Sequence, residues 1–392
     1  MSTTNSSNTM RFILSGGGTG GHIFPAVAIA NELQKRHGEN VTILFVGALG
    51  KMEMSKVPQA GYEIIGLPIE GLKRSMSPRN FIVGIKTIIS FIKARRIIKN
   101  FKPDAVIGTG GYASLPVCFM ASKMGIPVFL QEQNGFAGLT NKLVGKSAVT
   151  TCTGFPEMDK FFPGGNWIFT GNPVRKNIID SATAYHQSPV KSKNEALKKF
   201  GFIAEKPVLF ITGGSLGART INESIAQGLT ALTQAGVQVI WQMGERFWDA
   251  NQCTISDNIS QLESEIGYKP AVIYSAFLNN MDEAYQAADL VVARSGAITI
   301  SELCILGKPA ILIPSPNVTD DHQTKNAEVL SKREAAILIT DKNCEAELIP
   351  SILALIQNQD KQKQMRSELL ALAKPNATAE IVDIITKHIT IK

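Results

Sequence analysis

The chain has 392 residues, of which 44% are hydrophobic and 19% are charged. This balance excludes an intrinsically disordered chain, and the length favours two domains over one. The net charge of +7 is uneven, because residues 1–172 carry +9 and residues 173–392 carry −2. The first half therefore predicts an anionic partner: phosphates, nucleic acid or an acidic membrane.

Residues 1–10 are rich in Ser, Thr and Asn, which predicts a loose tail without the apolar core of a secretory signal. No uninterrupted apolar run reaches the roughly 18 residues of a membrane span. The five cysteines show no paired spacing, which favours free thiols in a reducing cytoplasm.

From residue 11 onward, strand-like and helix-like runs alternate, which predicts a parallel sheet with helices on both faces. The predicted strands are 11–15, 41–47, 63–66, 104–108, 127–131, 148–151 and 167–169. The predicted helices are 25–37, 51–59, 79–100, 112–124 and 137–144. These elements form a first domain over residues 11–172.

A turn-rich break at 171–175, followed by the polar stretch 180–195, predicts a linker and a second domain over 173–392. The alternation restarts with strands at 207–212, 237–241, 271–274, 289–292, 310–313 and 336–339, a helix at 218–234 and a helical tail from 345. We expect two Rossmann-like α/β domains, with the last helix packing back on the first. Ligands are expected in the cleft that faces the carboxyl ends of the strands.

The first strand runs directly into Ser15-Gly-Gly-Gly-Thr-Gly-Gly-His22, and Pro25 is predicted to open the helix that follows. Backbone N–H groups in such a loop can hold an anion or a polar sugar. The spacing fits the dinucleotide fingerprint, but the second strand ends Leu44-Phe-Val-Gly-Ala48 without the acid that this fingerprint needs. No Gly-Lys-Ser/Thr follows either glycine loop, which excludes a P-loop, and the histidine spacing argues against zinc.

Two interpretations of His22 are open. It can act as a general base or orient a substrate, or it can simply bond to the backbone where its helix starts. The second glycine loop, 213–217, also precedes a helix and can hold a diphosphate with its N–H groups and the Ser215 hydroxyl, or can serve only as a tight turn.

Glu302 lies two turns into a helix after the apolar strand 289–293, where a carboxylate can accept two hydrogen bonds from a ribose diol. The alternative is a solvated helical glutamate. The polar cluster 320–326 follows the next strand, and its acid and amide groups can recognise sugar hydroxyls.

The helical stretch 79–102 interleaves large aliphatic residues with cations. One alternative is an ordinary amphipathic helix on its sheet, but it has more apolar residues than one face needs, which favours docking on an anionic membrane. Nucleic acid is disfavoured because base stacking requires aromatic side chains. The predicted membrane contacts are Phe81, Ile82, Ile85, Lys86, Ile89 and Lys93.

Six blocks occur in one order along the chain: 16–26, 108–114, 131–134, 170–175, 213–218 and 294–302. They read Gly-Gly-Gly-Thr-Gly-Gly-His-Ile-Phe-Pro-Ala, Gly-Thr-Gly-Gly-Tyr-Ala-Ser, Gln-Glu-Gln-Asn, Thr-Gly-Asn-Pro-Val-Arg, Gly-Gly-Ser-Leu-Gly-Ala and Arg-Ser-Gly-Ala-Ile-Thr-Ile-Ser-Glu. Together they resemble the signature of the MurG family, glycosyltransferase family 28, over nearly the whole chain. The resemblance implies a GT-B fold, in which two Rossmann-like domains with parallel sheets flank a central cleft.

The resemblance also implies inverting transfer of N-acetylglucosamine from UDP-GlcNAc to the C4 hydroxyl of undecaprenyl-diphospho-MurNAc-pentapeptide in peptidoglycan synthesis. It implies no metal and no cofactor, a peripheral position on the cytoplasmic face of the plasma membrane, and contact with other wall-synthesis proteins. Two rival interpretations are a non-catalytic nucleotide-sugar or lipid-diphosphate binding protein, and a GT-B transferase with another donor.

By block matching, the implied site has three parts. The donor residues are Thr19, Gly20, Gly21, Asn134, Arg175, Ser215, Leu278, Ala297, Ile298, Thr299, Ile300, Ser301, Glu302 and Gln323. The acceptor residues are Gly16, Gly17, Gly18, Gly110, Gly111, Tyr112 and Glu132. His22 is the implied catalytic base, or else orients the acceptor.

Overall fold

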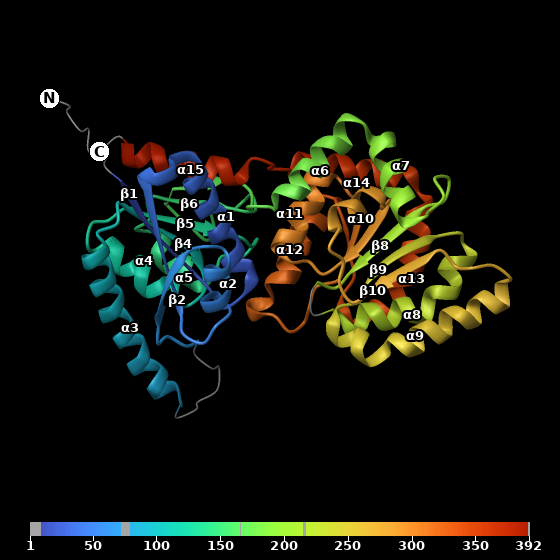
Figure 1. Cartoon of the computed structure of the whole chain (residues 1–392), viewed down its shortest axis with the longest axis horizontal. Helices are drawn as coiled ribbons and strands as arrows, with labels where there is room; N and C mark the ends of the chain where they lie inside the picture. The colour runs from blue at the N-terminus through green and yellow to red at the C-terminus, as the bar shows by residue number, and fades with distance from the viewer. Residues whose placement is uncertain (1–8, 72–78, 165, 215–216, 391–392) are drawn as a thin grey trace. The chain divides into compact units, whose positions relative to one another are not determined.

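The computed structural model describes residues 9–71, 79–164, 166–214 and 217–390. The chain divides into two compact units (Figure 1). Unit 1 comprises residues 1–174 together with 376–392, and unit 2 comprises residues 175–375. Each unit is a parallel sheet covered by helices, as the sequence predicts.

Unit 1 holds a seven-stranded sheet in the order β3-β2-β1-β4-β5-β6-β7, in which every pair is parallel. Its strands are β1 (Met10–Gly16), β2 (Val41–Ala48), β3 (Glu63–Leu67), β4 (Ala105–Gly110), β5 (Val128–Glu132), β6 (Thr150–Thr153) and β7 (Trp167–Phe169). Its α-helices are α1 (Gly20–His37), α2 (Glu53–Gln59), α3 (Arg79–Phe101), α4 (Ser114–Lys123), α5 (Leu139–Gly145) and α15 (Ala377–Thr390), and a 3₁₀ turn covers Gly38–Asn40.

Strand β1 lies inside this sheet, between β2 and β4, and from Phe12 onward it is buried on both faces. Phe12 and Leu14 pack into one hydrophobic cluster, while Ile13 packs into the other. The first cluster includes Ile381 and Ile385 of α15, so the last helix of the chain completes the core of unit 1. Burial on both faces is typical of parallel sheets and explains the uninterrupted apolar run that marked this strand in the sequence.

Unit 2 holds a six-stranded parallel sheet in the order β10-β9-β8-β11-β12-β13. Its strands are β8 (Val208–Thr212), β9 (Gln238–Gln242), β10 (Val272–Ser275), β11 (Leu290–Ala293), β12 (Ala310–Leu312) and β13 (Ile337–Leu338). Its α-helices are α6 (Lys176–Gln187), α7 (Pro189–Phe200), α8 (Arg219–Gln234), α9 (Glu245–Ile266), α10 (Met281–Ala287), α11 (Ala297–Leu306), α12 (His322–Ser331), α13 (Cys344–Gln357) and α14 (Gln359–Ala371), and short 3₁₀ turns cover Thr319–Asp321 and Asp341–Asn343.

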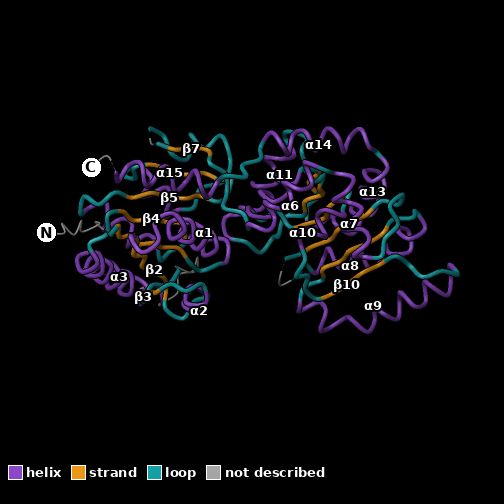
Figure 2. Tube along the Cα trace, turned by 45° about the horizontal axis from the view of Figure 1, so that its top comes forward, coloured by secondary structure: helices purple, strands orange, loops and turns teal. Residues whose placement is uncertain are grey.

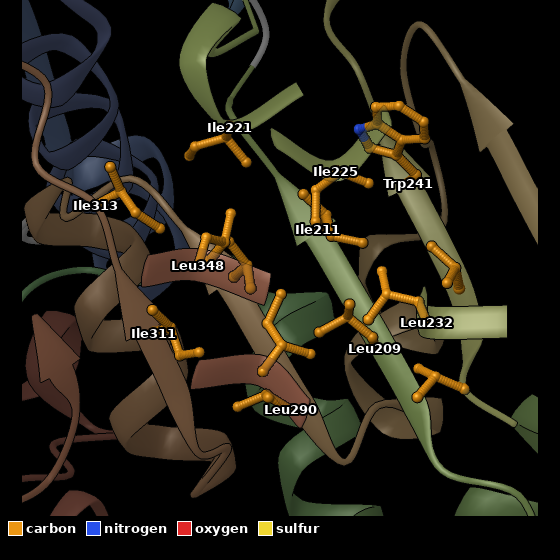
Figure 3. Close-up of a cluster of buried hydrophobic side chains, with 14 of the residues drawn as sticks. Leu209, Ile211, Ile221, Ile225, Leu232, Trp241, Leu290, Ile311, Ile313 and Leu348 are labelled. Atoms are coloured by element: carbon orange, nitrogen blue, oxygen red, sulfur yellow. The ribbon is translucent and has the colours of Figure 1, made fainter. Parts of the chain in front are cut away.

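The core of unit 2 forms where β8, β9 and β11 meet helices α8 and α13 (Figure 3). Leu209 and Ile211 of β8 contribute to it together with Ile225 of α8 and Leu348 of α13, and all four are fully buried. This packing holds the carboxyl end of β8, where the second glycine loop begins.

Two local predictions are wrong. Helix α1 begins at Gly20, so Pro25 lies inside the helix rather than opening it, and His22 belongs to the first helical turn. The polar stretch 180–195 is not a loose linker, because α6 and α7 occupy it. Figure 2 shows both as regular helices. Each helix buries one face, through residues such as Ile178 and Leu197. These few apolar residues are easily overlooked in a stretch that is mainly polar.

Candidate functional site

The glycine loop after β1 packs against a second glycine pair at the end of β4. Because β1 and β4 are neighbours in a parallel sheet, both loops leave the same edge. Gly17 donates its N–H to the Gly110 carbonyl over 3.4 Å. A Cβ on Gly111 would lie 2.3 Å from the Gly17 carbonyl oxygen, and the φ of +82° at Gly111 also requires glycine. The predicted acceptor residues of the two loops therefore lie together.

His22 lies against both loops. Its Nδ1 is 3.1 Å from the Gly17 carbonyl oxygen and 3.3 Å from the Thr19 hydroxyl. A carbonyl oxygen only accepts, so a hydrogen bond to Gly17 requires the proton on Nδ1, and in the neutral ring this tautomer makes Nε2 the basic nitrogen. A Cβ on Gly110 would lie 2.8 Å from the His22 ring. The glycine at 110 therefore makes room for this imidazole.

Tyr112 extends the same cluster, and its hydroxyl would lie 3.4 Å from a Cβ on Gly18. Thr109 ties the cluster to α1, because its buried hydroxyl donates to the His22 carbonyl oxygen over 2.7 Å. A Cβ on Gly16 would lie 1.9 Å from that hydroxyl oxygen. The loop is therefore shaped by Thr109, which belongs to the block 108–114 but is not among the predicted site residues.

Glu132 ends the neighbouring strand β5 and is buried, unlike an ordinary ligand-facing acid. Its Oε1 accepts the Asn134 N–H over 3.1 Å, while Oε2 accepts from the Gly138 N–H and the Asn141 side-chain amide, each over 2.9 Å. These bonds fix the loop that carries Asn134. Glu132 thus shapes the surface beside the glycine loops from inside the protein, through the loop that it holds.

Glu53 is a further residue of unit 1 that the sequence analysis missed. It begins helix α2, has no exposed surface, and accepts backbone N–H groups from Ala48 and Gly18, each over 3.0 Å. An acid in the first turn of a short helix looks like an ordinary helix-end charge. The sequence therefore does not indicate that Glu53 bonds to the glycine loop.

In unit 2, Glu302 is buried on α11 and paired with Arg175. The guanidinium of Arg175 donates from Nη2 and Nε to Oε1, over 2.8 and 3.1 Å, and the Tyr285 hydroxyl donates to Oε2 over 3.2 Å. Burial raises the pKa of the Glu302 carboxyl, although Arg175 and Tyr285 both act to lower it. The carboxylate is thus held in one orientation at an energetic cost.

The other predicted donor residues of unit 2 lie on α11, on α12 and in the loop before α10. Helix α11 places Ala297 and Ile300 inside the protein, with Ile298, Thr299 and Ser301 partly exposed. The Leu278 N–H donates to the Gln242 side chain over 3.2 Å, and the Gln323 side-chain oxygen accepts the Ser315 N–H over 2.8 Å. Ser215 lies outside the described residues.

Comparison with known proteins assigns the family. Residues 12–153 match the glycosyltransferase family 28 N-terminal domain, and residues 208–382 match its C-terminal domain. A Porphyromonas gingivalis relative, named UDP-N-acetylglucosamine--N-acetylmuramyl-(pentapeptide) pyrophosphoryl-undecaprenol N-acetylglucosamine transferase, is 48% identical over 388 residues, 99% of this chain and 98% of its own. The chain belongs to glycosyltransferase family 28.

Other relatives agree with this family. A Cytophaga hutchinsonii protein of the same name is 46% identical over 95% of both chains. The crystal structure of Acinetobacter baumannii MurG matches with a TM-score of 0.77 and 29% identity, covering 96% of this chain and 99% of that one. A UDP-GlcNAc 2-epimerase from Neisseria meningitidis, at 18% identity and a TM-score of 0.63, shares the fold alone. The predicted GT-B fold and glycosyltransferase activity of the family are therefore confirmed.

Helix α3 carries an apolar surface in this family 28 protein. Its exposed aliphatic and aromatic residues are Phe81, Ile82, Ile85, Ile88, Ile89 and Ile92. Lys86 pairs with Glu70, and Lys93 donates to the Gly66 carbonyl oxygen over 2.8 Å, so both amino groups are held toward their own domain. No helix in the described residues is long and apolar enough to cross a membrane.

Proposed function

We propose that the chain transfers N-acetylglucosamine from UDP-GlcNAc to undecaprenyl-diphospho-MurNAc-pentapeptide, releasing UDP. The observation that carries this proposal is the near-complete match, at 48% identity, to a relative named for that transfer. The two sites support it chemically, because unit 1 presents a histidine beside a side-chain-free loop and unit 2 presents a buried carboxylate suited to a nucleoside.

The reaction is a single in-line displacement at the anomeric carbon. The C4 hydroxyl of the muramoyl sugar attacks C1 of N-acetylglucosamine, and its proton passes to Nε2 of His22. The bond between C1 and the phosphate oxygen breaks, its electron pair leaves with UDP, and the configuration at C1 inverts. Such general-base assistance contributes about 10²–10⁴-fold to the rate. An imidazole whose Nδ1–H is held by a carbonyl presents its basic nitrogen in a fixed direction.

The donor nucleotide is assigned to unit 2. An ionised carboxylate offers about four acceptor positions, and Arg175 and Tyr285 together use three on Glu302. A ribose diol needs two. Donor binding therefore requires Arg175 to give up at least one of its two bonds to Glu302, which frees an N–H of its guanidinium for the diphosphate. The half-exposed side chain of Arg175 is able to make this move.

The acceptor is assigned to the glycine loops of unit 1, with Tyr112 beside them. Gly16 and Gly17 are buried, so the surface that these loops offer to a diphosphate or a sugar is at Gly18, Gly111 and the exposed Tyr112. In this proposal Glu132 shapes the loop that holds Asn134, whereas Thr19, Gly20 and Gly21 meet the donor sugar.

The apolar surface of α3 is proposed to rest on the cytoplasmic face of the plasma membrane, where the lipid-linked acceptor resides. Six exposed apolar residues on one helix are more than a fully solvated surface requires. Arg95, Arg96 and Lys99 are exposed on the same helix and suit anionic lipid headgroups. Wall-synthesis proteins remain further proposed partners.

The test is UDP release from UDP-GlcNAc by wild-type protein and His22→Ala, with and without the lipid-linked muramoyl peptide. We expect acceptor-dependent release, lowered about 10²–10⁴-fold in kcat by the substitution, with little change in the KM for UDP-GlcNAc. A different base is required if His22→Ala turns over at the wild-type rate. Absence of acceptor-dependent UDP release would instead favour a binding protein.

A further inference from the structure

We propose that Glu53 is a positioning residue for His22, and that it acts through the peptide group joining Gly17 to Gly18. The idea rests on the proposed function of His22 as the base. It assigns a role to a buried carboxylate that the transfer mechanism above does not use.

We call the series of hydrogen bonds from Glu53 to His22 the relay. Its first part is the hydrogen bonding of Glu53 to the glycine loop. Its Oε2 accepts the Gly18 N–H and its Oε1 accepts the Ala48 N–H, each over 3.0 Å. A Cβ on Gly17 would lie 2.1 Å from Oε1, and one on Gly47 would lie 2.6 Å from the Glu53 Cγ. The carboxylate thus fills the space that two side chains would need, which leaves it a single position.

The second part lies on the other side of the same peptide group. The N–H that Glu53 holds belongs to Gly18, and the carbonyl joined to it belongs to Gly17. That carbonyl oxygen is 3.1 Å from Nδ1 of His22. The order is therefore carboxylate, peptide N–H, peptide carbonyl, imidazole Nδ1–H. Hydrogen bonds in series polarise one another, so an anion at the N–H makes the carbonyl a stronger acceptor.

The consequence for the base is twofold. A stronger carbonyl acceptor fixes the proton on Nδ1 and leaves Nε2 to receive the acceptor proton. It also stabilises the imidazolium that forms during attack, as a buried aspartate does when it bonds directly to a catalytic histidine. Glu53 itself takes no proton, because the hydroxyl proton stays on Nε2 until it leaves to solvent or product.

The first experiment needs no substitution at Glu53. The protein has five histidines, so ¹⁵N-histidine labelling gives few signals, and the His22 signal is the one missing in His22→Ala. At a pH where the ring is neutral, we expect ¹⁵N shifts of the Nδ1–H tautomer. A dominant Nε2–H tautomer overturns the proposal.

The second experiment compares Glu53→Gln with Glu32→Gln. The amide introduced by Glu53→Gln keeps the shape of the carboxylate but turns an NH₂ group toward one of the two backbone N–H donors. Glu32 lies on the same helix as His22, where it pairs with Lys35 and Arg36 away from the loop, and is the matched control. We expect Glu53→Gln to lower kcat by about 10- to 100-fold, with the KM for UDP-GlcNAc within about twofold, and to weaken the tautomer preference of His22.

The outcomes separate the relay from the base assignment. An unchanged His22 tautomer in folded Glu53→Gln overturns the relay even where its rate falls, because the fall then reports only a disturbed loop. A fall of equal size in Glu32→Gln also overturns it. If His22→Ala turns over at the wild-type rate, His22 is not the base. The His22 tautomer, measured in the wild-type protein and in Glu53→Gln, then still shows whether the hydrogen bonds from Glu53 to His22 are in place.

Discussion

Replacing Glu302 with Gln should weaken donor binding without weakening the fold. The Gln side chain has the same shape, its oxygen can still accept from Arg175, and its amide can donate to the Tyr285 hydroxyl oxygen. What it removes is a charge that burial holds at an unfavourable pKa. The side chain therefore gives a case in which stability and activity are expected to separate.

The size of the functional effect follows from the hydrogen bonds. A bond to a charged acceptor contributes about 1.5–3 kcal/mol and one to a neutral acceptor about 0.5–1.5 kcal/mol, so each ribose hydroxyl loses roughly 1 kcal/mol. One or two such bonds predict a KM for UDP-GlcNAc that is about 5- to 30-fold higher, with kcat little changed. Steady-state UDP release at saturating acceptor measures both constants.

The effect on stability has a definite sign. The folded-state pKa of Glu302 is raised above its ordinary value of 4.5, so the folded state binds this proton more tightly than the unfolded state does. Wild-type stability therefore falls, relative to Glu302→Gln, as pH rises from about 4.5 through the folded pKa, and the difference is then constant. Urea unfolding of both proteins between pH 4.5 and 7.5 measures it. A free energy of unfolding for Glu302→Gln that is about 2 kcal/mol below wild type at pH 7 would refute this reasoning.

Three further outcomes are expected. Gly110→Ala should lower kcat by about 100-fold with an unchanged donor KM, measured by UDP release, because its Cβ at φ +99° would displace the His22 ring. Ile88→Ser should weaken binding to anionic vesicles about fivefold in sedimentation assays, whereas Ile203→Ser, at a residue of unit 2 that is also more than half exposed, should not. Lys308 is buried, and desolvation lowers its pKa to about 8, so wild type should gain about 1.4 kcal/mol of unfolding free energy per pH unit relative to Lys308→Met between pH 8 and 10.5.

The sheets could be predicted from the sequence because their inner parallel strands, such as β4, β5 and β8, are buried on both faces. Residues 208–212 illustrate this, since all five are buried and the first four form an apolar run, Val-Leu-Phe-Ile, just before Thr212 and a glycine loop. The neighbouring order of strands then brings the loops after β1, β4 and β5 to one edge, which the alternation of elements already implied. The glycine clusters at strand ends were therefore the most informative local signal.

Side-chain pairing could not be predicted in the same way. Arg175 and Glu302 are 127 positions apart, and nothing local in either sequence shows that they form an ion pair. Tyr285 lies on the buried face of α10 and is a core residue, yet its hydroxyl donates to Glu302. Whether a carboxylate binds ribose, a guanidinium or both depends on how many of its acceptor positions are not already used by neighbouring donors. Only the three-dimensional structure shows how many are used.

The glycine loop after β1 lacks one residue of the dinucleotide fingerprint. This absence correctly argues against a dinucleotide, but it does not mean that the strand end has no carboxylate near it. The dinucleotide fingerprint requires an acid at the end of the second strand to bind a ribose, and residues 44–48 contain none. The structure does place a carboxylate there, because Glu53 folds back to bond the Ala48 N–H. Since its two oxygens accept backbone N–H groups and it is wholly buried, it has no surface to offer a ribose. The loop is thereby tied to its own domain and to His22, which suits proton transfer better than cofactor binding.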